Sequence, residues 1–269
     1  MSIDRRKFLT LSGLSALGLA GAPAVRVFGQ DTTDVAQDTT PAEPAQPEQP
    51  RAPLVAQRWA MVIDINKCVA AEGCRDCALA CHKVHNVPDF DNPKDEVKWI
   101  WKESFEHAFH DQEHAHQSEK LRHATLPVLC NHCDDPPCTR VCPTESTWKR
   151  ESDGLVMMDW HRCIGCRYCV AACPYGSRSF NWRDPRPHID EINKSYPTRT
   201  RGVVEKCTFC DERLARGQMP ACVEACKEKA MIFGDLEDPE SEVRQVLRET
   251  FTIRRKPGLG THPEIYYIV

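Results

Sequence analysis

The sequence predicts an α+β fold built from small strand–loop–helix units, with loop-rich insertions between them. The 16 cysteines of this 269-residue chain fall into four groups of four, and none is left over. Short β-type runs flank the groups at Met61–Ile63, Leu155–Met158 and Met231–Phe233, while Cys77–His82 and Cys169–Cys173 suit short helices. This pattern is typical of a small repeated unit.

The first 24 residues predict a twin-arginine signal peptide. Arg5 and Arg6 precede a mildly apolar stretch, and the small residues Ala22, Pro23 and Ala24 form an A-x-A-like cleavage site. The apolar stretch is too short to span a bilayer, and the paired arginines point to the twin-arginine route, which carries folded proteins. We therefore expect a periplasmic protein, peripheral to the cytoplasmic membrane. A general secretion signal with a chance arginine pair is the alternative.

Residues 25–57 predict a proline-rich linker. From Pro41 to Pro53 a proline recurs at every third residue, which matches the turn of a polyproline II helix and suggests a semi-rigid tether. We expect the folded part to begin near Arg58. No later stretch is apolar enough to span a membrane, so we expect membrane contact only through partners.

The cysteine groups carry the chemistry. In chain order they are Cys68, Cys74, Cys77, Cys81; Cys130, Cys133, Cys138, Cys142; Cys163, Cys166, Cys169, Cys173; and Cys207, Cys210, Cys222, Cys226. The third group reads CIGCRYCVAACP, the C-x2-C-x2-C-x3-C-P run of two-cluster bacterial ferredoxins. In that run three thiolates bind one [4Fe–4S] cluster and the fourth cysteine binds its neighbour. We expect Gly165 to let the loop pass close to the cluster.

Other functional classes fit the sequence less well. Structural zinc sites usually join two C-x2-C pairs across a dozen or more residues, and closely packed cysteines give poor geometry for separate disulfides; these two remain the alternatives. The absence of any C-x-x-C-H excludes c-type haem. The formal charge of -4, with no long basic run, makes nucleic acid an unsuitable partner. We find no hydrolytic or nucleotide-binding motif, so we expect no catalysis by this chain.

The remaining groups, with spacings C-x2-C-x4-C-x3-C and C-x2-C-x11-C-x3-C, resemble the four-cluster iron–sulfur subunits of molybdopterin oxidoreductases and of polysulfide or nitrite reductase complexes. Residues 147–175, 206–226 and 260–268 carry this resemblance, which extends from Arg58 onward. The twin-arginine leader, RWAMVIDINKC and CRDCALACHKVHNVPDF also resemble the DsrO family, whose members belong to DsrMKJOP complexes of sulfur metabolism. The five residues between Cys68 and Cys74 depart from the usual C-x2-C start.

The resemblance implies two nested ferredoxin-like units. The outer unit would comprise 58–87 and 200–235 and the inner unit 127–176, with insertions at 88–126 and 177–199 and a helix and tail at 236–269. It also implies four ligand sets, which we name after the group that supplies three of the four cysteines. The first set is Cys68, Cys74, Cys77 and Cys226; the second is Cys130, Cys133, Cys138 and Cys173; the third is Cys163, Cys166, Cys169 and Cys142; the last is Cys207, Cys210, Cys222 and Cys81.

The resemblance also implies the function and the partners. The chain would relay single electrons, as a non-catalytic subunit of a membrane-associated complex. Its partners would be a membrane-embedded quinone-interacting subunit and a multihaem cytochrome c. A subunit feeding a molybdopterin oxidoreductase is the alternative.

Several lesser features complete the sequence-based predictions. A solvated helix should place His107, His110 and His114 on one face, with metal binding as the alternative. We expect Tyr168, Tyr175 and Trp182 to pack around clusters, and His82 and His132 to lie just outside the ligands. We expect Arg199, Arg201 and Arg213 to be solvated or paired surface charges. Asp238 should cap a helix with Pro239 at its first position, running to about Thr250, followed by an irregular tail with Tyr266 and Tyr267.

Overall fold

The computed structural model describes residues 51–269. The expected signal peptide and most of the expected linker lie outside these residues. Within the described range, no helix has both the length and the apolar character needed to cross a membrane.

Residues 51–57, which we assigned to the linker, contact the folded part. The Leu54 amide donates to the Leu214 carbonyl at 2.9 Å, and the Gln57 amide donates to Asp235 Oδ2 at 2.8 Å. Ala56 is buried. Ordered packing therefore begins several residues before Arg58.

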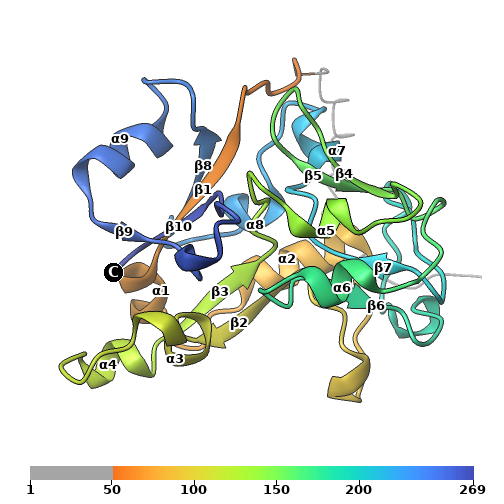
Figure 1. The fold of residues 1–269 in the computed structure, drawn as a ribbon, viewed down its shortest axis with the longest axis horizontal. Helices are drawn as coiled ribbons and strands as arrows, with labels where there is room; N and C mark the ends of the chain where they lie inside the picture. Colours follow the sequence, from red (N-terminus) through yellow and green to blue (C-terminus); the bar gives the residue numbers. More distant parts are fainter. Residues whose placement is uncertain (1–50) are drawn as a thin grey trace, which may run out of the picture. The chain divides into compact units, whose positions relative to one another are not determined.

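A four-stranded sheet has the first strand of the described chain near its centre (Figure 1). Its order is β8 (Met231–Asp235), β1 (Trp59–Asp64), β10 (Ile265–Ile268) and β9 (Thr252–Ile253). Met61 pairs with Phe233 in the antiparallel register and with Ile265 in the parallel register. Because successive side chains of a strand face opposite sides, Ala60 and Val62 pack with Val243 of α9 (Glu242–Glu249), whereas Met61 and Ile63 belong to the main core.

Three two-stranded antiparallel sheets accompany this sheet. They pair β2 (Ile100–Ser104) with β3 (Thr125–Leu129), β4 (Thr147–Lys149) with β5 (Val156–Met158), and β6 (Ser179–Phe180) with β7 (Val204–Glu205). All three β-type runs that the sequence indicated fall in strands β1, β5 and β8, so these predictions are confirmed.

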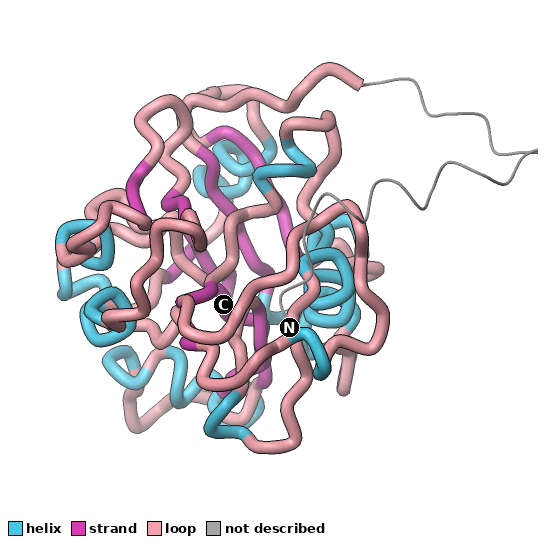
Figure 2. The backbone as a smooth tube through the Cα atoms, turned by 90° about the vertical axis from the view of Figure 1, so that its right-hand side faces the viewer, coloured by secondary structure: helices cyan, strands magenta, loops and turns pink. Residues whose placement is uncertain are grey.

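Short helices and many loops connect the strands (Figure 2). The remaining α-helices are α1 (Ile65–Ala70), α2 (Asp76–His85), α3 (Phe105–Ala108), α4 (Glu119–Arg122), α5 (Pro137–Arg140), α6 (Tyr168–Ala172), α7 (Asp211–Leu214) and α8 (Ala221–Glu224). Four 3-10 turns are η1 (Pro93–Asp95), η2 (His110–Gln112), η3 (Arg186–His188) and η4 (Pro257–Leu259). Helices α2 and α6 confirm the predicted helical segments, and the described chain mixes helices and strands as an α+β fold does.

Two predictions about the end of the chain are wrong. Asp238 accepts from the Glu240 amide at 2.9 Å and thus closes a turn, so the N-cap passes to Ser241, whose hydroxyl accepts from the Arg244 amide at 3.3 Å. The helix therefore begins at Glu242. The tail is not irregular either, because Tyr266 and Tyr267 lie in β10, paired with β1.

The histidine-rich segment does not form one helix. Helix α3 ends after one turn at Ala108, because the backbone of Phe109 leaves the helical region with φ -129° and ψ 35°. His110 lies in the following 3-10 turn, and His114 lies beyond it in an irregular segment. The three imidazoles therefore share no helical face.

Candidate metal centres

All sixteen cysteines lie in the described part of the chain, and none forms a disulfide. Nine of them are buried and seven partly buried. Disulfides, the alternative suggested by the even number of cysteines, are therefore absent from residues 51–269.

The first ligand set lines one small cavity. Its four sulfurs come from α1, the turn after it, α2 and the residue two positions after α8. Burial raises the pKa of the Cys68 thiol to about 12. Since metal ligation requires thiolates, such a site needs cationic iron to hold the sulfurs in the charged form.

The last ligand set joins distant parts of the chain. Cys81 is buried in α2, and its electrostatic neighbours include Cys207, Cys210 and Cys222. Burial first, and these thiols second, raise the pKa of Cys81 well above its usual range. Helix α2 also packs on α8, which carries Cys222.

The second ligand set also lines a small cavity, which it shares with Pro174, Tyr175 and Arg178. Cys173, from the end of α6, therefore lies with Cys130, Cys133 and Cys138 rather than only with its own group.

The third ligand set lies nearer the surface. Cys163 and Cys169 are electrostatic neighbours, and α5, which leads to Cys142, packs against α6. Burial raises the pKa of Cys142, but hydrogen bonds from the Ser146 hydroxyl and from the amides of Thr147 and Thr144 outweigh it and lower the pKa to about 7. These hydrogen bonds therefore favour the thiolate form of Cys142.

Backbone amides point at several of the sulfurs. Phe209 N–H donates to Cys207 Sγ at 3.4 Å, Ala221 N–H to Cys210 Sγ at 3.4 Å, and Ala230 N–H to Cys226 Sγ at 3.2 Å. Such donors stabilise negative charge on cluster sulfur and tune its potential. The four cysteine groups therefore fit [4Fe–4S] ligation in donor type, burial and surrounding hydrogen bonds.

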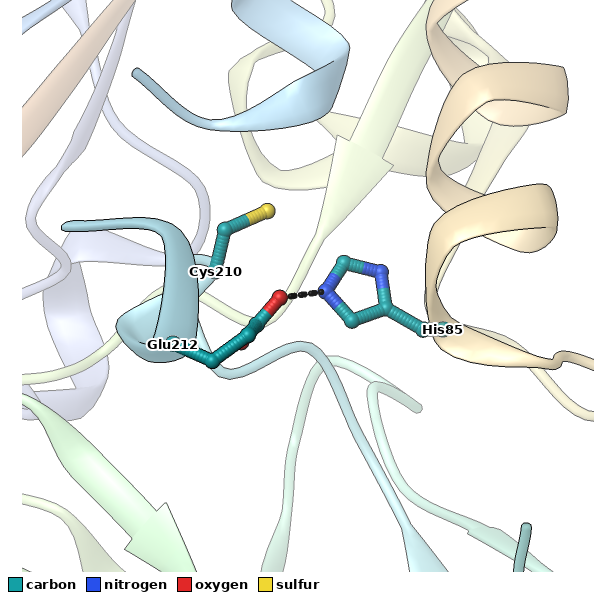
Figure 3. A group of neighbouring side chains, drawn as sticks. All are labelled: His85, Cys210 and Glu212. Carbon is teal, nitrogen blue, oxygen red and sulfur yellow. Dashed lines mark hydrogen bonds and ion pairs between the residues drawn. The ribbon is translucent and has the colours of Figure 1, made fainter. Parts of the chain in front are cut away.

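His85, Cys210 and Glu212 meet beside the last set (Figure 3). Their ligand atoms lie within 4.8 Å of one another, and His85 Nε2 lies 3.0 Å from Glu212 Oε1. Because Cys210 belongs to the last set, we assign this trio to the surroundings of that set.

Gly165 lies against a second loop of the protein. Its φ is +69°, and a Cβ there would lie 2.2 Å from the Gly202 carbonyl oxygen and 3.0 Å from the Phe180 ring. The missing side chain lets the cysteine loop pack against the loop at Gly202.

The aromatic and histidine predictions have mixed outcomes. Tyr175 is buried beside the second set, whereas Tyr168 is 61% exposed and Trp182 is about half exposed, at 49%. His132 is buried and stacks on Phe209 at 3.8 Å. It accepts from the Val156 amide through Nδ1, so its Nε2–H donates to the Cys207 carbonyl.

Four cations that the sequence did not predict to be buried are Arg178, Arg199, Lys206 and Arg255. Arg199, which we predicted at the surface, is 2% exposed, and its Nη2 lies 2.6 Å from Glu205 Oε2. Arg178 and Lys206 are also buried, and both approach cysteines. Their positions, five residues after Cys173 and directly before Cys207, were the only signal in the sequence.

The comparisons with known proteins agree with this geometry. Residues 121–186 and 192–236 match the model of the 4Fe-4S dicluster domain. The protein is 38% identical to the Hdr-like menaquinol oxidoreductase iron-sulfur subunit 1 of Archaeoglobus fulgidus, over 98% of this chain and 97% of that protein. The chain belongs to the family of 4Fe-4S iron–sulfur subunits.

Other members of this iron–sulfur subunit family are also similar. The protein is 36% identical to the iron-sulfur cluster-binding subunit of menaquinone reductase of Nitratidesulfovibrio vulgaris, over 78% of this chain and 88% of that one. It is 33% identical to the B subunit of polysulfide reductase of Wolinella succinogenes, over 80% and 95%. As an iron–sulfur subunit of reductase type, the protein transfers electrons.

Proposed function

We propose that this protein is a non-catalytic subunit that relays single electrons through four [4Fe–4S] clusters. The observation that carries the proposal is the gathering of sixteen cysteines free of disulfides, with two of the four ligand sets each lining a cavity with all four cysteines. Each cluster, when bound, supplies a one-electron redox centre. The protein's own residues bind the clusters, bury them and fix their order in space.

We assign the ligands as the four sets defined above. The cavity walls support the first and second sets, and the neighbours of Cys81 support the last. The third set rests on Cys163 with Cys169 and on the packing of α5 against α6. Two nested ferredoxin-like units, outer and inner, would follow from this pairing.

The sets follow one another in a definite spatial order. Cys77 of the first set is an electrostatic neighbour of Cys222 of the last set. Cys207 of the last set is a neighbour of Cys130 of the second, and Cys138 of the second is a neighbour of Cys169 of the third. The relay we propose therefore runs first, last, second, third, in either direction.

The third set lies at one end of this relay. The residues around it suit a docking site for a partner protein. Ile164 and Tyr168, beside its cysteines, expose 66% and 61% of their surface. Trp182 is also half exposed, with the Arg167 guanidinium 4.7 Å from its ring centroid. Exposed aromatic and arginine side chains are typical of protein interfaces.

For location and partners we propose a periplasmic subunit of a DsrMKJOP-like complex, exported by the twin-arginine route. It would meet a membrane-embedded quinone-interacting subunit and a multihaem cytochrome c. The name of the menaquinol oxidoreductase relative supports a quinol-linked complex. A subunit feeding a molybdopterin oxidoreductase is equally compatible with the polysulfide reductase relative.

Iron analysis tests the proposal. The purified protein should contain about four iron atoms per ligand set. It should absorb at about 400 nm, and dithionite should bleach this absorbance. Zinc in place of iron would contradict it. Purifying the native complex and identifying its subunits would then separate the DsrMKJOP-like complex, with its cytochrome c, from a molybdopterin enzyme.

A further inference from the structure

We propose that Arg178 and Lys206 make the cluster bound by the second ligand set the highest-potential centre of the relay. This inference rests on the proposed function, because it concerns the clusters that the cysteines would hold. It adds the order of potentials, which the cysteine spacing does not contain.

Arg178 lies between the second and third ligand sets. It is 4% exposed, and its Nη2 donates to Cys138 Sγ at 3.0 Å and to Thr147 Oγ1 at 2.8 Å. It is also the main electrostatic influence that opposes burial at the thiol of Cys169, in the third set. A guanidinium stays protonated in proteins, so this is a permanent positive charge in contact with ligand sulfur.

Lys206 lies between the second and last ligand sets. It is completely buried, and its ammonium donates to the Cys207 carbonyl at 2.6 Å. Burial, and to a lesser extent the neighbouring Arg178, lower the pKa of this ammonium, while Cys130, Cys207 and Cys138 are the electrostatic neighbours that favour its charge. No carboxylate reaches either cation within ion-pair distance in residues 51–269.

The other two buried cations of the described chain show what distinguishes this pair. Arg199 has a carboxylate, since its Nη2 lies 2.6 Å from Glu205. Arg255 donates to the Ala108 carbonyl and lies 5.5 Å from the Tyr175 ring centroid. Of these four cations, Arg178 and Lys206 are the ones that meet cysteines directly. A buried charge without a counter-ion is strongly destabilising, and a cluster with four thiolates would provide the missing negative charge.

The same charges act on the redox equilibrium. Reduction adds one negative charge to a cluster, and a nearby cation in a poorly screened interior stabilises that charge. Arg178 therefore raises the potentials of the second and third sets, and Lys206 those of the second and last. The second set feels both cations, while the first set touches neither.

This arrangement predicts a pattern that does not depend on assigning each signal. Potentiometric titration of the cluster-loaded protein, followed by electron paramagnetic resonance, gives the midpoints. Arg178→Gln should lower two midpoints, and Lys206→Gln should lower two. One midpoint should fall in both variants, and it should be the highest of the unmodified protein; one midpoint should fall in neither.

Controls separate a charge effect from a loosened structure. Arg183→Gln and Lys194→Gln remove exposed cations and should leave every midpoint unchanged. Arg178→Lys keeps the charge and should shift the midpoints less than half as far as Arg178→Gln. If Arg178→Gln fails to retain iron, Lys206→Gln still carries the test, because it should lower two midpoints, including the highest, and leave the other two unchanged.

Two results would overturn the inference. One is a uniform shift of all midpoints in either variant, which indicates a general loosening; the other is unchanged midpoints with full iron content. Failure of the proposed function looks different, because the unmodified protein would then lack iron or show fewer than four midpoints.

Discussion

His85 Nε2 lies 3.0 Å from the carboxylate of Glu212, although 127 residues separate the two in the chain. His85 ends α2, and its Nδ1 lies 2.9 Å from the Cys81 carbonyl oxygen in the preceding turn. Glu212 lies in α7, two residues after Cys210. The contact thus fixes the end of α2 against α7 and holds Cys81 among the last cysteine group.

The crossed ligand assignment can be tested by double substitution. If Cys226 completes the first set, Cys68→Ala with Cys226→Ala should lose no more iron than Cys226→Ala alone, about four atoms for one cluster. Cys222→Ala with Cys226→Ala should lose more, because it would damage two sets. Iron analysis of the purified variants gives the answer. The assignment fails if Cys222, rather than Cys68, proves redundant with Cys226.

Gly165→Ala should destabilise the protein more than Gly176→Ala. Both glycines have φ near +65° to +70°, but only at Gly165 does a Cβ meet backbone, 2.2 Å from the Gly202 oxygen. The conformational cost alone is about 1 kcal/mol, and the clash adds about 1–3 kcal/mol. Thermal unfolding of the cluster-loaded variants should therefore give the lowest midpoint for Gly165→Ala. Equal unfolding midpoints for the two variants would contradict this prediction, because they would show that the loop at Gly202 moves away from the added Cβ at no cost in stability.

Arg199→Met should strongly destabilise the fold. It leaves Glu205 buried with Trp99 Nε1–H at 2.9 Å and Asn181 Nδ2 at 2.5 Å but no cation, a change that typically costs about 3–5 kcal/mol. Arg186→Met, which removes an exposed partner of Asp184, is the control and should unfold at the native temperature. Adding Glu205→Leu to Arg199→Met should recover part of the loss; no recovery would refute the unpaired-charge explanation.

Replacing Arg5 and Arg6 by Lys should keep the protein in the cytoplasm. The twin-arginine route reads the arginine pair itself, so the conservative change tests the route rather than the charge. Fractionation of cells expressing the cluster-loaded protein measures it. A leader with Lys7→Arg is the matched control and should leave export unchanged. Normal periplasmic levels of the double variant would contradict the export proposal.

The cysteine groups and their flanking strands could be predicted from the sequence, because both depend on residues that are close together in the chain. The third group and β5 illustrate this, since CIGCRYCVAACP and Val156–Met158 need no distant information. Local signals also compete, as at α9, where Asp238 and Ser241 both suit an N-cap and the turn at Asp238 decided the outcome.

The features that the sequence did not predict depend on contacts between residues far apart in the chain. The sequence predicts Arg199 as a surface charge, but in the structure Glu205, Trp99 and His85 surround it. Tyr267 reads as part of a tail until β10 pairs with β1 and buries its ring. Phe109 lies in the polar, histidine-rich segment, yet its ring is buried against Phe105 and Tyr267. Each case depends on a partner that no local pattern identifies.

The central position of β1 has a consequence for biosynthesis. Its two neighbours, β8 and β10, are made long after it. Arg58, just before β1, and Glu264, just before β10, are 206 residues apart, and their side chains pair where these two adjacent strands begin. On the ribosome, all sixteen cysteines emerge before Ile265–Ile268 can complete the sheet around β1. We therefore expect iron insertion to be completed only after β10 has paired with β1.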